Sequence, residues 1–288
     1  MNGNHMMFGL ALLVVQTACA AGRVFWVDNV RGDDAAAGTE EAPVATVEEG
    51  LYRTKAGGTC HVGAGEWTSR ASLFLDGQKL KGAGRDATYL SAYQNGEPAV
   101  LIAASDVTAS DMTVRNSSMG VQHESLYVAN TNATVEAMTF DNCKIGIYQI
   151  ELRGLWKGLT LARHYQQAFA AVGCEFLDGG RGIFANNYGG GGCSDTMTFS
   201  CRNCLFARNQ YGIYDNDSMP YQSRKCNSIV HSTFVANSVY AAKYAIAHYP
   251  GTIDHRNCIY KGVCGLYSQT MDNINLISCL FDCETNTV

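Results

Sequence analysis

The segment 174–183 reads CEFLDGGRGI, and the segment 204–213 reads CLFARNQYGI. In both, a cysteine is followed two positions later by a phenylalanine, and a Gly-Ile step begins six positions after that phenylalanine. Variants of this pattern occur seven times between Val107 and Cys283, each around one large apolar anchor. The anchors lie 21 to 36 residues apart and are Val114, Phe140, Phe176, Phe206, Phe234, Tyr260 and Phe281. Self-similarity at this period indicates a solenoid, in which each unit buries its apolar face by stacking on its neighbours.

The apolar residues within each unit alternate as they do in strands, with one interruption. Positions seven and five before the anchor are mostly apolar, and so are position two before it and the anchor itself, so the alternation slips in between. The slip falls at Asp111, Ala137, Gly173, Asn203, His231, Asn257 and Ser278. Asn, Asp and Gly tolerate the left-handed backbone that a one-residue bend requires. Each unit is therefore predicted to be strand, bend, strand, turn and a third strand, which makes an all-β, three-sided parallel β-helix with about seven regular coils.

The N-terminal part of the chain follows a different pattern. The segment Pro43-Val44-Ala45-Thr46 leads into a short predicted amphipathic helix that runs to about Lys55, with Thr46 and Glu49 at capping-box spacing and glycines after its end. We expect this helix to cover the open N-terminal end of the solenoid. Irregular early coils follow, with strands expected at residues 59–62, 73–75, 79–81 and 100–103. The predicted organisation is a signal peptide at 1–20, an N-terminal strand and capping helix at 21–58, and the β-helix at 59–288.

The first twenty residues have the features of an export signal. An apolar run from Phe8 to Val15 ends in Ala18-Cys19-Ala20, a small-x-small cleavage pattern. A lipid anchor on Cys19 and a buried N-terminal strand are the alternatives. No other segment is apolar enough to span a membrane. We therefore expect a secreted, periplasmic or cell-surface protein.

The amino-acid composition limits the classes of binding partner and the cysteine chemistry to expect. Only 16% of the residues are charged, the formal net charge is -5, and no basic stripe is present, so a nucleic-acid partner is not expected. Twelve cysteines, eleven after cleavage, predict some disulfides in an exported protein, with Cys193 and Cys226 as the better candidates. The Cys201–Cys204 CxxC pair falls on inward positions, which favours core packing over a metal or redox site. Oligomeric state does not follow from the sequence.

Several short motifs carry a resemblance to a known superfamily. They are FWVD at 25–28, GDD at 32–34, GT at 38–39, AP at 42–43, AT at 45–46 and KGAGR at 81–85. With the repeats, they resemble secreted pectate-lyase-like right-handed parallel β-helix proteins over nearly all the mature chain. The resemblance implies that the parallel β-helix is right-handed. It does not select an activity, because the superfamily includes lyases, hydrolases, esterases and non-catalytic surface proteins. The galacturonan-hydrolase motifs Asn-Thr-Asp, Gly-His-Gly and Arg-Ile-Lys are absent.

Candidate catalytic residues come from the end of the third strand. Nine residues after the anchor lie His123, Gln149, Ala185, Asp215 and Lys243, and eleven after it lie Glu151 and Asp217. Coils about 4.8 Å apart would bring Asp215, Asp217 and Lys243 together. Two aspartates, with Glu151 nearby, could hold Ca²⁺ against a uronate carboxylate, while Lys243 removes a proton. An ordinary solvated rim of charges is the alternative.

Candidate substrate-binding residues lie in the loops between the third strand and the next coil, where the repeat varies in length. They are Trp156, Arg163, His164, Tyr188, Tyr221, Arg224 and His248. Aromatic rings stack on sugars and cations pair with uronate or sulfate groups. Loop aromatics that only pack on the β-helix are the alternative.

Two functions therefore stay open. One is an exported enzyme acting on an acidic glycan, with a polysaccharide lyase favoured over a glycoside hydrolase. The other is a non-catalytic secreted or surface β-helix with a glycan-binding or structural role.

Overall fold

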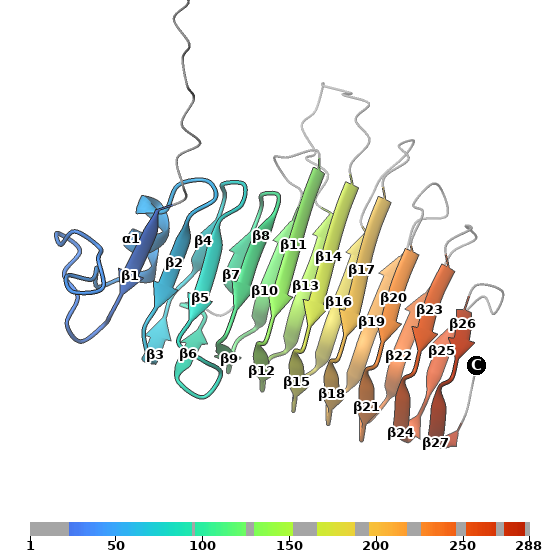
Figure 1. Cartoon of the computed structure of the whole chain (residues 1–288). Helices are drawn as coiled ribbons and strands as arrows, with labels where there is room; N and C mark the ends of the chain where they lie inside the picture. The colour runs from blue at the N-terminus through green and yellow to red at the C-terminus, as the bar shows by residue number, and fades with distance from the viewer. Residues whose placement is uncertain are drawn as a thin grey trace, which may run out of the picture.

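A computed structural model describes residues 23–93, 96–124, 130–151, 166–187, 196–217, 226–245, 252–268 and 274–285. There the backbone winds through three parallel sheets that extend along the molecule (Figure 1). Each regular coil contributes one strand to each sheet, in the order sheet 1, sheet 2, sheet 3. The signal peptide predicted at 1–20 lies outside the described residues, and no helix within them is long and apolar enough to cross a membrane.

The strand bounds follow the coil order. Sheet 1 contains β1 (Val24–Val27), β2 (Thr59–Val62), β5 (Lys79–Gly82), β8 (Val107–Ser110), β11 (Asn130–Glu136), β14 (Gln166–Val172), β17 (Thr196–Arg202), β20 (Cys226–Val230), β23 (Thr252–Arg256) and β26 (Ile274–Ile277). Sheet 2 contains β3 (Gly65–Thr68), β6 (Thr88–Ser91), β9 (Thr113–Arg115), β12 (Thr139–Asp141), β15 (Glu175–Leu177), β18 (Leu205–Ala207), β21 (Thr233–Val235), β24 (Ile259–Cys264) and β27 (Leu280–Thr285). Sheet 3 contains β4 (Ala71–Leu73), β7 (Pro98–Ile102), β10 (Met119–Glu124), β13 (Ile145–Glu151), β16 (Arg181–Asn187), β19 (Tyr211–Asp217), β22 (Tyr240–Ala245) and β25 (Leu266–Ser268).

The bend between sheets 1 and 2 lies where the alternation predicted it. All seven predicted bend residues have left-handed backbone, from φ 50° at Ala137 to φ 61° at Gly173, and Asn203 and Asn257 have φ 54° and 52°. A single left-handed residue turns the chain from one sheet to the next without a loop. The prediction is confirmed.

A second left-handed bend, two residues after the anchor, turns the chain out of sheet 2. It occurs at Asn116, Asn142, Asp178, Arg208 and Ala236, with φ between 49° at Asn142 and 58° at Arg208. The repeat pattern predicted a turn of unspecified type here. Arg208 and Ala236 carry no local signal for left-handed backbone, so residue type could not reveal this bend in every coil.

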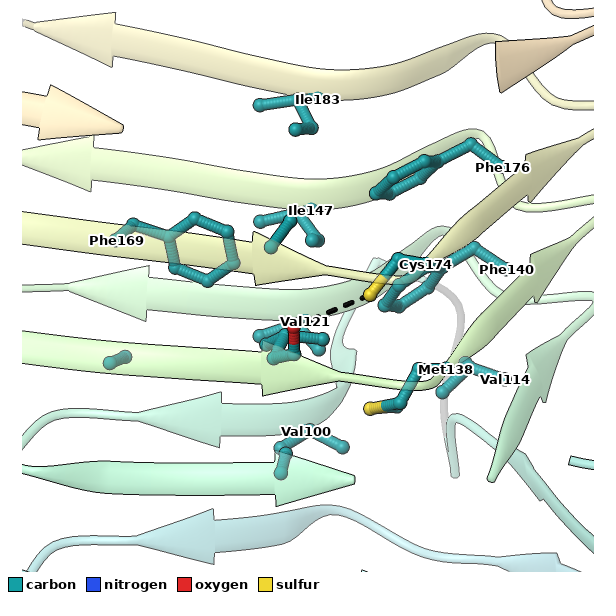
Figure 2. Close-up of a cluster of buried hydrophobic side chains, with 14 of the residues drawn as sticks. Val100, Val114, Val121, Met138, Phe140, Ile147, Phe169, Cys174, Phe176 and Ile183 are labelled. Carbon is teal, nitrogen blue, oxygen red and sulfur yellow. Dashed lines mark hydrogen bonds between the residues drawn. The ribbon is translucent and has the colours of Figure 1, made fainter. Parts of the chain in front are cut away.

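The anchors form one interior column. Rings of successive coils stack with centroids 5.0 Å apart for Phe140–Phe176, 4.7 Å for Phe176–Phe206 and 4.6 Å for Phe206–Phe234. Tyr260 and Phe281 continue the column. Figure 2 shows part of it, beside a parallel row of branched aliphatic side chains from sheet 3. The predicted column two residues earlier is also buried, from Met112 to Cys258.

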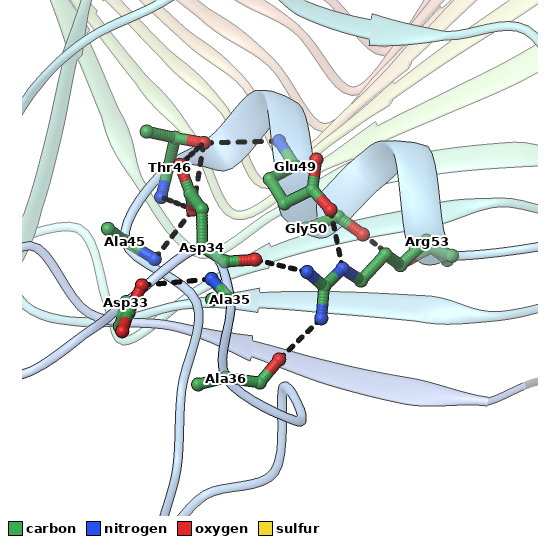
Figure 3. A network of polar contacts seen from close by, with 10 residues as sticks. Asp33, Asp34, Ala35, Ala36, Ala45, Thr46, Glu49, Gly50 and Arg53 are labelled. Atoms are coloured by element: carbon green, nitrogen blue, oxygen red, sulfur yellow. Dashed lines mark hydrogen bonds and ion pairs between the residues drawn. The ribbon is translucent and has the colours of Figure 1, made fainter.

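The N-terminal end is covered by α1 (Val47–Arg53), as predicted. The Thr46 hydroxyl caps the helix by accepting from the Glu49 backbone N–H, and Val47, Gly50 and Leu51 are buried against the first coils. At the other end of the helix, Arg53 pairs with Glu49 and donates to the backbone oxygens of Asp34 and Ala36 (Figure 3). The same network binds the 33–36 loop to the helix. Because β1 pairs with β2, the N-terminal strand belongs to sheet 1.

Candidate functional site

The outer face of sheet 3 carries a row of aromatic side chains. Register places Gln122, Tyr148, Phe184, Tyr214, Lys243 and Tyr267 opposite one another in successive coils, and we call them the outer row. The Tyr148–Phe184 and Phe184–Tyr214 centroids are 5.2 and 5.3 Å apart with rings 7° from parallel. Rings so stacked turn their faces toward one another, so they offer edges and phenol hydroxyls outward. The row is therefore a surface for hydrogen bonding more than for stacking.

Two cations lie on this row without a counter-ion. The Arg181 guanidinium carbon Cζ is 4.5 Å from the Phe184 ring centroid and 5.2 Å from that of Tyr214. The Lys243 Nζ is 5.2 Å from the Tyr214 centroid and 5.6 Å from that of Tyr267. Within the described residues neither has a carboxylate at salt-bridge distance. Arg181 Nε is buried and has no hydrogen-bond partner in the protein.

Asparagine and glutamine side-chain amides lie on the same face of sheet 3. Asn186 donates from Nδ2 to the Tyr148 hydroxyl at 3.3 Å, and Asn216 donates to Asn186 Oδ1 at 3.5 Å. At the N-terminal end of the row, Gln122 donates to the Glu124 carboxylate at 2.7 Å. From β16 to β25, no outward side chain that the structure describes is negatively charged. The cationic part of the face is thus rich in donors and free of competing carboxylates.

Asp215 and Lys243 lie on opposite faces of sheet 3. Lys243 pairs in register with Tyr214 on the outer face, while Asp215 pairs with Tyr244 and is fully buried. The cause is an extra residue: Tyr211 follows its anchor by five residues, but Tyr240 follows Phe234 by six. The predicted alignment of Lys243 with Asp215 was wrong by one position. Asp215 as a Ca²⁺ ligand and Lys243 as the base therefore cannot act on the same sugar, as the lyase mechanism required.

The rest of the predicted polar column lies inside the protein. Register aligns His123, Gln149, Ala185, Asp215 and Tyr244, which we call the inner row, and all five are buried. From the repeat pattern, this column was expected to lie at a polar edge. In fact the strand alternation that directs the Gly-Ile isoleucines inward directs the inner row inward too.

Glu151, Asn187 and Asp217 are aligned in backbone register, as the repeat predicted. Their side chains lie outside the described part of the structure. Among the described side chains, no group of three or more His, Cys, Asp or Glu could hold a metal ion. Ca²⁺ bound by Asp217 and Glu151 therefore stays a prediction, and the Asp215 carboxylate, buried beside Tyr244, faces away from Lys243.

The loop candidates all lie outside the described residues: Trp156, Arg163, His164, Tyr188, Tyr221, Arg224 and His248. Their roles stay predictions. By contrast, Arg181 and Tyr214 were not predicted. They lie five and eight residues after their anchors, and the only available signal was the aromatic residue that recurs eight residues after the anchor in three coils, at Tyr148, Phe184 and Tyr214.

A second polar group is buried near the C-terminal coils. The Tyr244 hydroxyl is 3.0 Å from His255 Nε2, and the Tyr260 hydroxyl contacts Nδ1 of the same ring. Burial lowers the pKa of His255 to about 3, so the ring is neutral, and each nitrogen has a phenol partner. These contacts satisfy a buried histidine, and the ring is not accessible for proton transfer to a ligand.

Seven cysteines in the described residues, from Cys60 to Cys279, carry free thiols. Cys201 and Cys204 point inward and are 1% and 3% exposed, which confirms core packing for the CxxC pair. Burial raises the pKa of the Cys201 thiol and raises that of Cys60 to about 12, so both are protonated and unreactive. The predicted candidates for disulfide formation, Cys193 and Cys226, have no described side chain.

Known proteins with this architecture were found by structure alone. No family model and no curated protein matches the sequence. The pectin methylesterase PemA from Erwinia chrysanthemi superposes with a TM-score of 0.53 and 10% identity over 88% of this chain and 92% of that one. A pectin methylesterase in complex with a hexasaccharide superposes with a TM-score of 0.51 and 12% identity, covering 85% and 80%. At such low identity the likeness concerns the fold. The chain has the right-handed parallel β-helix fold that these pectin methylesterases share.

Proposed function

We propose that the protein is an exported, carbohydrate-directed β-helix that binds an acidic glycan along the outer face of sheet 3. The observation that carries the proposal is a pair of cations, Arg181 and Lys243, which lie on either side of Tyr214 in an aromatic row and have no carboxylate partner among the described residues. A carboxylate or sulfate on a sugar would supply the missing counter-ion, with charge-assisted hydrogen bonds from Arg181.

The position of these cations favours a ligand over a structural role. Most arginines in the described residues are paired: Arg115, which also stacks on Tyr89, bonds to Glu66, and Arg208 bonds to Asp178. Arg181 is stacked in the same manner but has no such partner. Since the whole chain has a net charge of -5, attraction for a polyanion must come from a local site such as this one.

Neighbouring groups suit a sugar. The Tyr214 hydroxyl and the Asn216 amide can bond to sugar hydroxyls, while the buried Asn186 amide joins Asn216 to the Tyr148 hydroxyl across consecutive coils. The similarity in fold to a pectin methylesterase crystallised with a hexasaccharide supports the carbohydrate part of the proposal. An export signal at 1–20, predicted from the sequence, would deliver the protein to such a ligand.

The test measures binding to matched oligosaccharides, one set acidic and one neutral, by calorimetry. Arg181→Gln and Lys243→Gln should each weaken binding to the acidic set by about tenfold or more, because each removes a charge-assisted contact. The matched control is Arg115→Gln, which removes a stacked arginine from sheet 2 and should leave affinity unchanged. Binding should also weaken as salt is raised. Equal affinity of wild type and the double variant for acidic glycans would refute the proposal.

Turnover is a separate arm of the same experiment. Lyase activity produces unsaturated uronates that absorb in the ultraviolet, and it is followed with and without a chelator. Activity that is lost on chelation and restored by Ca²⁺ would support the predicted calcium site at Asp217 and Glu151. Binding without any change in absorbance would favour the non-catalytic alternative.

A further inference from the structure

Four buried polar side chains meet inside the corner between sheets 3 and 1. His123 and Gln149 lie near the ends of β10 and β13, and Thr131 and Gln167 lie near the starts of β11 and β14. Register pairs His123 with Gln149 and Thr131 with Gln167. All four are at most 3% exposed. We call them the corner cluster.

The two glutamines are held in one orientation by backbone oxygens. Gln167 donates from Nε2 to the His123 carbonyl at 2.9 Å and to that of Ile150 at 3.4 Å. Gln149 donates from Nε2 to the Thr198 carbonyl at 3.1 Å and to that of Gln167 at 3.5 Å. Because both amide nitrogens are used, neither side chain can be flipped without losing these bonds. The two Oε1 atoms are therefore left as acceptors.

Within the part of the chain that the structure describes, five atoms of the cluster have no hydrogen-bond partner: both ring nitrogens of His123, Thr131 Oγ1, Gln149 Oε1 and Gln167 Oε1. Burial lowers the pKa of His123 to about 3, so its ring is neutral and has one N–H. The cluster then has two donors, one from the imidazole and one from the Thr131 hydroxyl. Its acceptor atoms are four: the other ring nitrogen, the hydroxyl oxygen and the two Oε1 atoms.

Two donors cannot satisfy four acceptors, so the side chains cannot complete one another's hydrogen bonds. The cluster therefore needs further hydrogen-bond donors, and it is uncharged and buried. Water is the small molecule that supplies two O–H donors and also accepts, and buried water typically makes about three bonds to such groups. A metal ion would offer no donor, and the described residues contain no group suited to one.

We propose that the corner cluster binds ordered water inside the β-helix, bridging His123 to the Oε1 atoms of Gln149 and Gln167. The water links the ends of β10 and β13 to the starts of β11 and β14, so it completes the hydrogen bonding between sheets 3 and 1. The site is separate from the outer row, and the proposed glycan binding does not depend on it.

The direct test is a crystal structure of the full chain at a resolution that shows water. We expect an oxygen at about 2.7–3.2 Å from a His123 ring nitrogen and within reach of at least one of the two Oε1 atoms. A His123 ring bonded directly to either glutamine or to Thr131, with no such oxygen, would overturn the proposal.

A second test counts long-lived internal waters in solution by magnetic relaxation dispersion. Thr131→Val and His123→Phe each remove partners of the water while keeping the side-chain shape, and each should lower the count relative to wild type. Phe140→Leu is the matched control, because it shortens a buried ring in the anchor column, where any space it opens is lined by apolar side chains and stays dry. A count unchanged in both polar variants would contradict the site.

Discussion

The ring of Phe206 lies against the α-carbon of Gly182 in the preceding coil. A Cβ atom built on Gly182 would be 2.7 Å from Phe206 Cδ1 and 2.5 Å from the Gly212 carbonyl oxygen. The same contact recurs between Gly120 and Phe140 and between Gly146 and Phe176. The Phe and Gly of the repeat are thus one structural unit shared by two coils: the glycine of one coil makes room for the anchor of the next.

Gly182→Ala should therefore destabilise the protein by more than the roughly 1–3 kcal/mol typical of overpacking, because backbone and a stacked ring meet the new methyl together. Gly265→Ala is the matched control. Its Cβ would meet Phe281 at 3.5 Å, an ordinary van der Waals contact. Urea unfolding of both variants is the measurement, and equal midpoints would show that the close contact at Gly182 is not what limits this position.

Phe206→Ala should reduce the free energy of unfolding by about 3–5 kcal/mol, the usual cost of truncating a buried aromatic residue. Phe206 is fully buried and stacks on Phe176 at 4.7 Å and on Phe234 at 4.6 Å. Tyr52→Ala serves as control, because that ring is 75% exposed. A loss below about 1 kcal/mol for Phe206→Ala would argue against an energetic role for the anchor column.

Those features of the fold that recur in every coil could be predicted from the sequence. Anchors such as Phe206 and bends such as Asn203 stand at fixed spacing, so seven coils gave the same indication. Lys243 shows where prediction from the repeat fails. One extra residue between Phe234 and β22 moves each position of β22, counted from Phe234, to the opposite face of the sheet. No residue type in the turn reveals where the extra residue is accommodated.

The candidate site was less predictable for a second physical reason. Polarity suggested that His123, Gln149 and Asp215 lie at a surface, but all three are buried. Conversely, Tyr148 and Phe184 resemble core residues by composition, but they lie on the outer face of sheet 3, where they stack on one another and Phe184 is only 9% exposed. The face on which a side chain lies depends on strand parity, and parity at the end of a strand can be assigned only once the register is known.

Asn203→Val should destabilise the protein by about 1–2 kcal/mol, because Asn203 has φ 54° and a β-branched side chain is strained there. Asn203→Gly should be close to neutral, since glycine adopts this conformation freely. Thermal unfolding of the pair separates backbone strain from loss of the side chain. If the glycine variant were as unstable as the valine variant, the asparagine side chain would be the cause instead.

Stability should fall steeply in mild acid because of two buried histidines. Burial lowers the pKa of His123 and of His255 to about 3, against about 6.5 in the unfolded chain. For His255 alone, the nearby Asp254 carboxylate raises the pKa and offsets part of the effect of burial. Between these values the unfolded chain binds more protons, so the free energy of unfolding rises with pH and its full value is present above about pH 6.5. For each histidine, the free energy of unfolding should fall by roughly 2 kcal/mol between pH 7 and pH 5. Urea titrations at the two pH values measure this, and His123→Phe should remove about half of the loss. A variant with the same pH dependence as wild type would mean that His123 does not stay neutral in the folded protein.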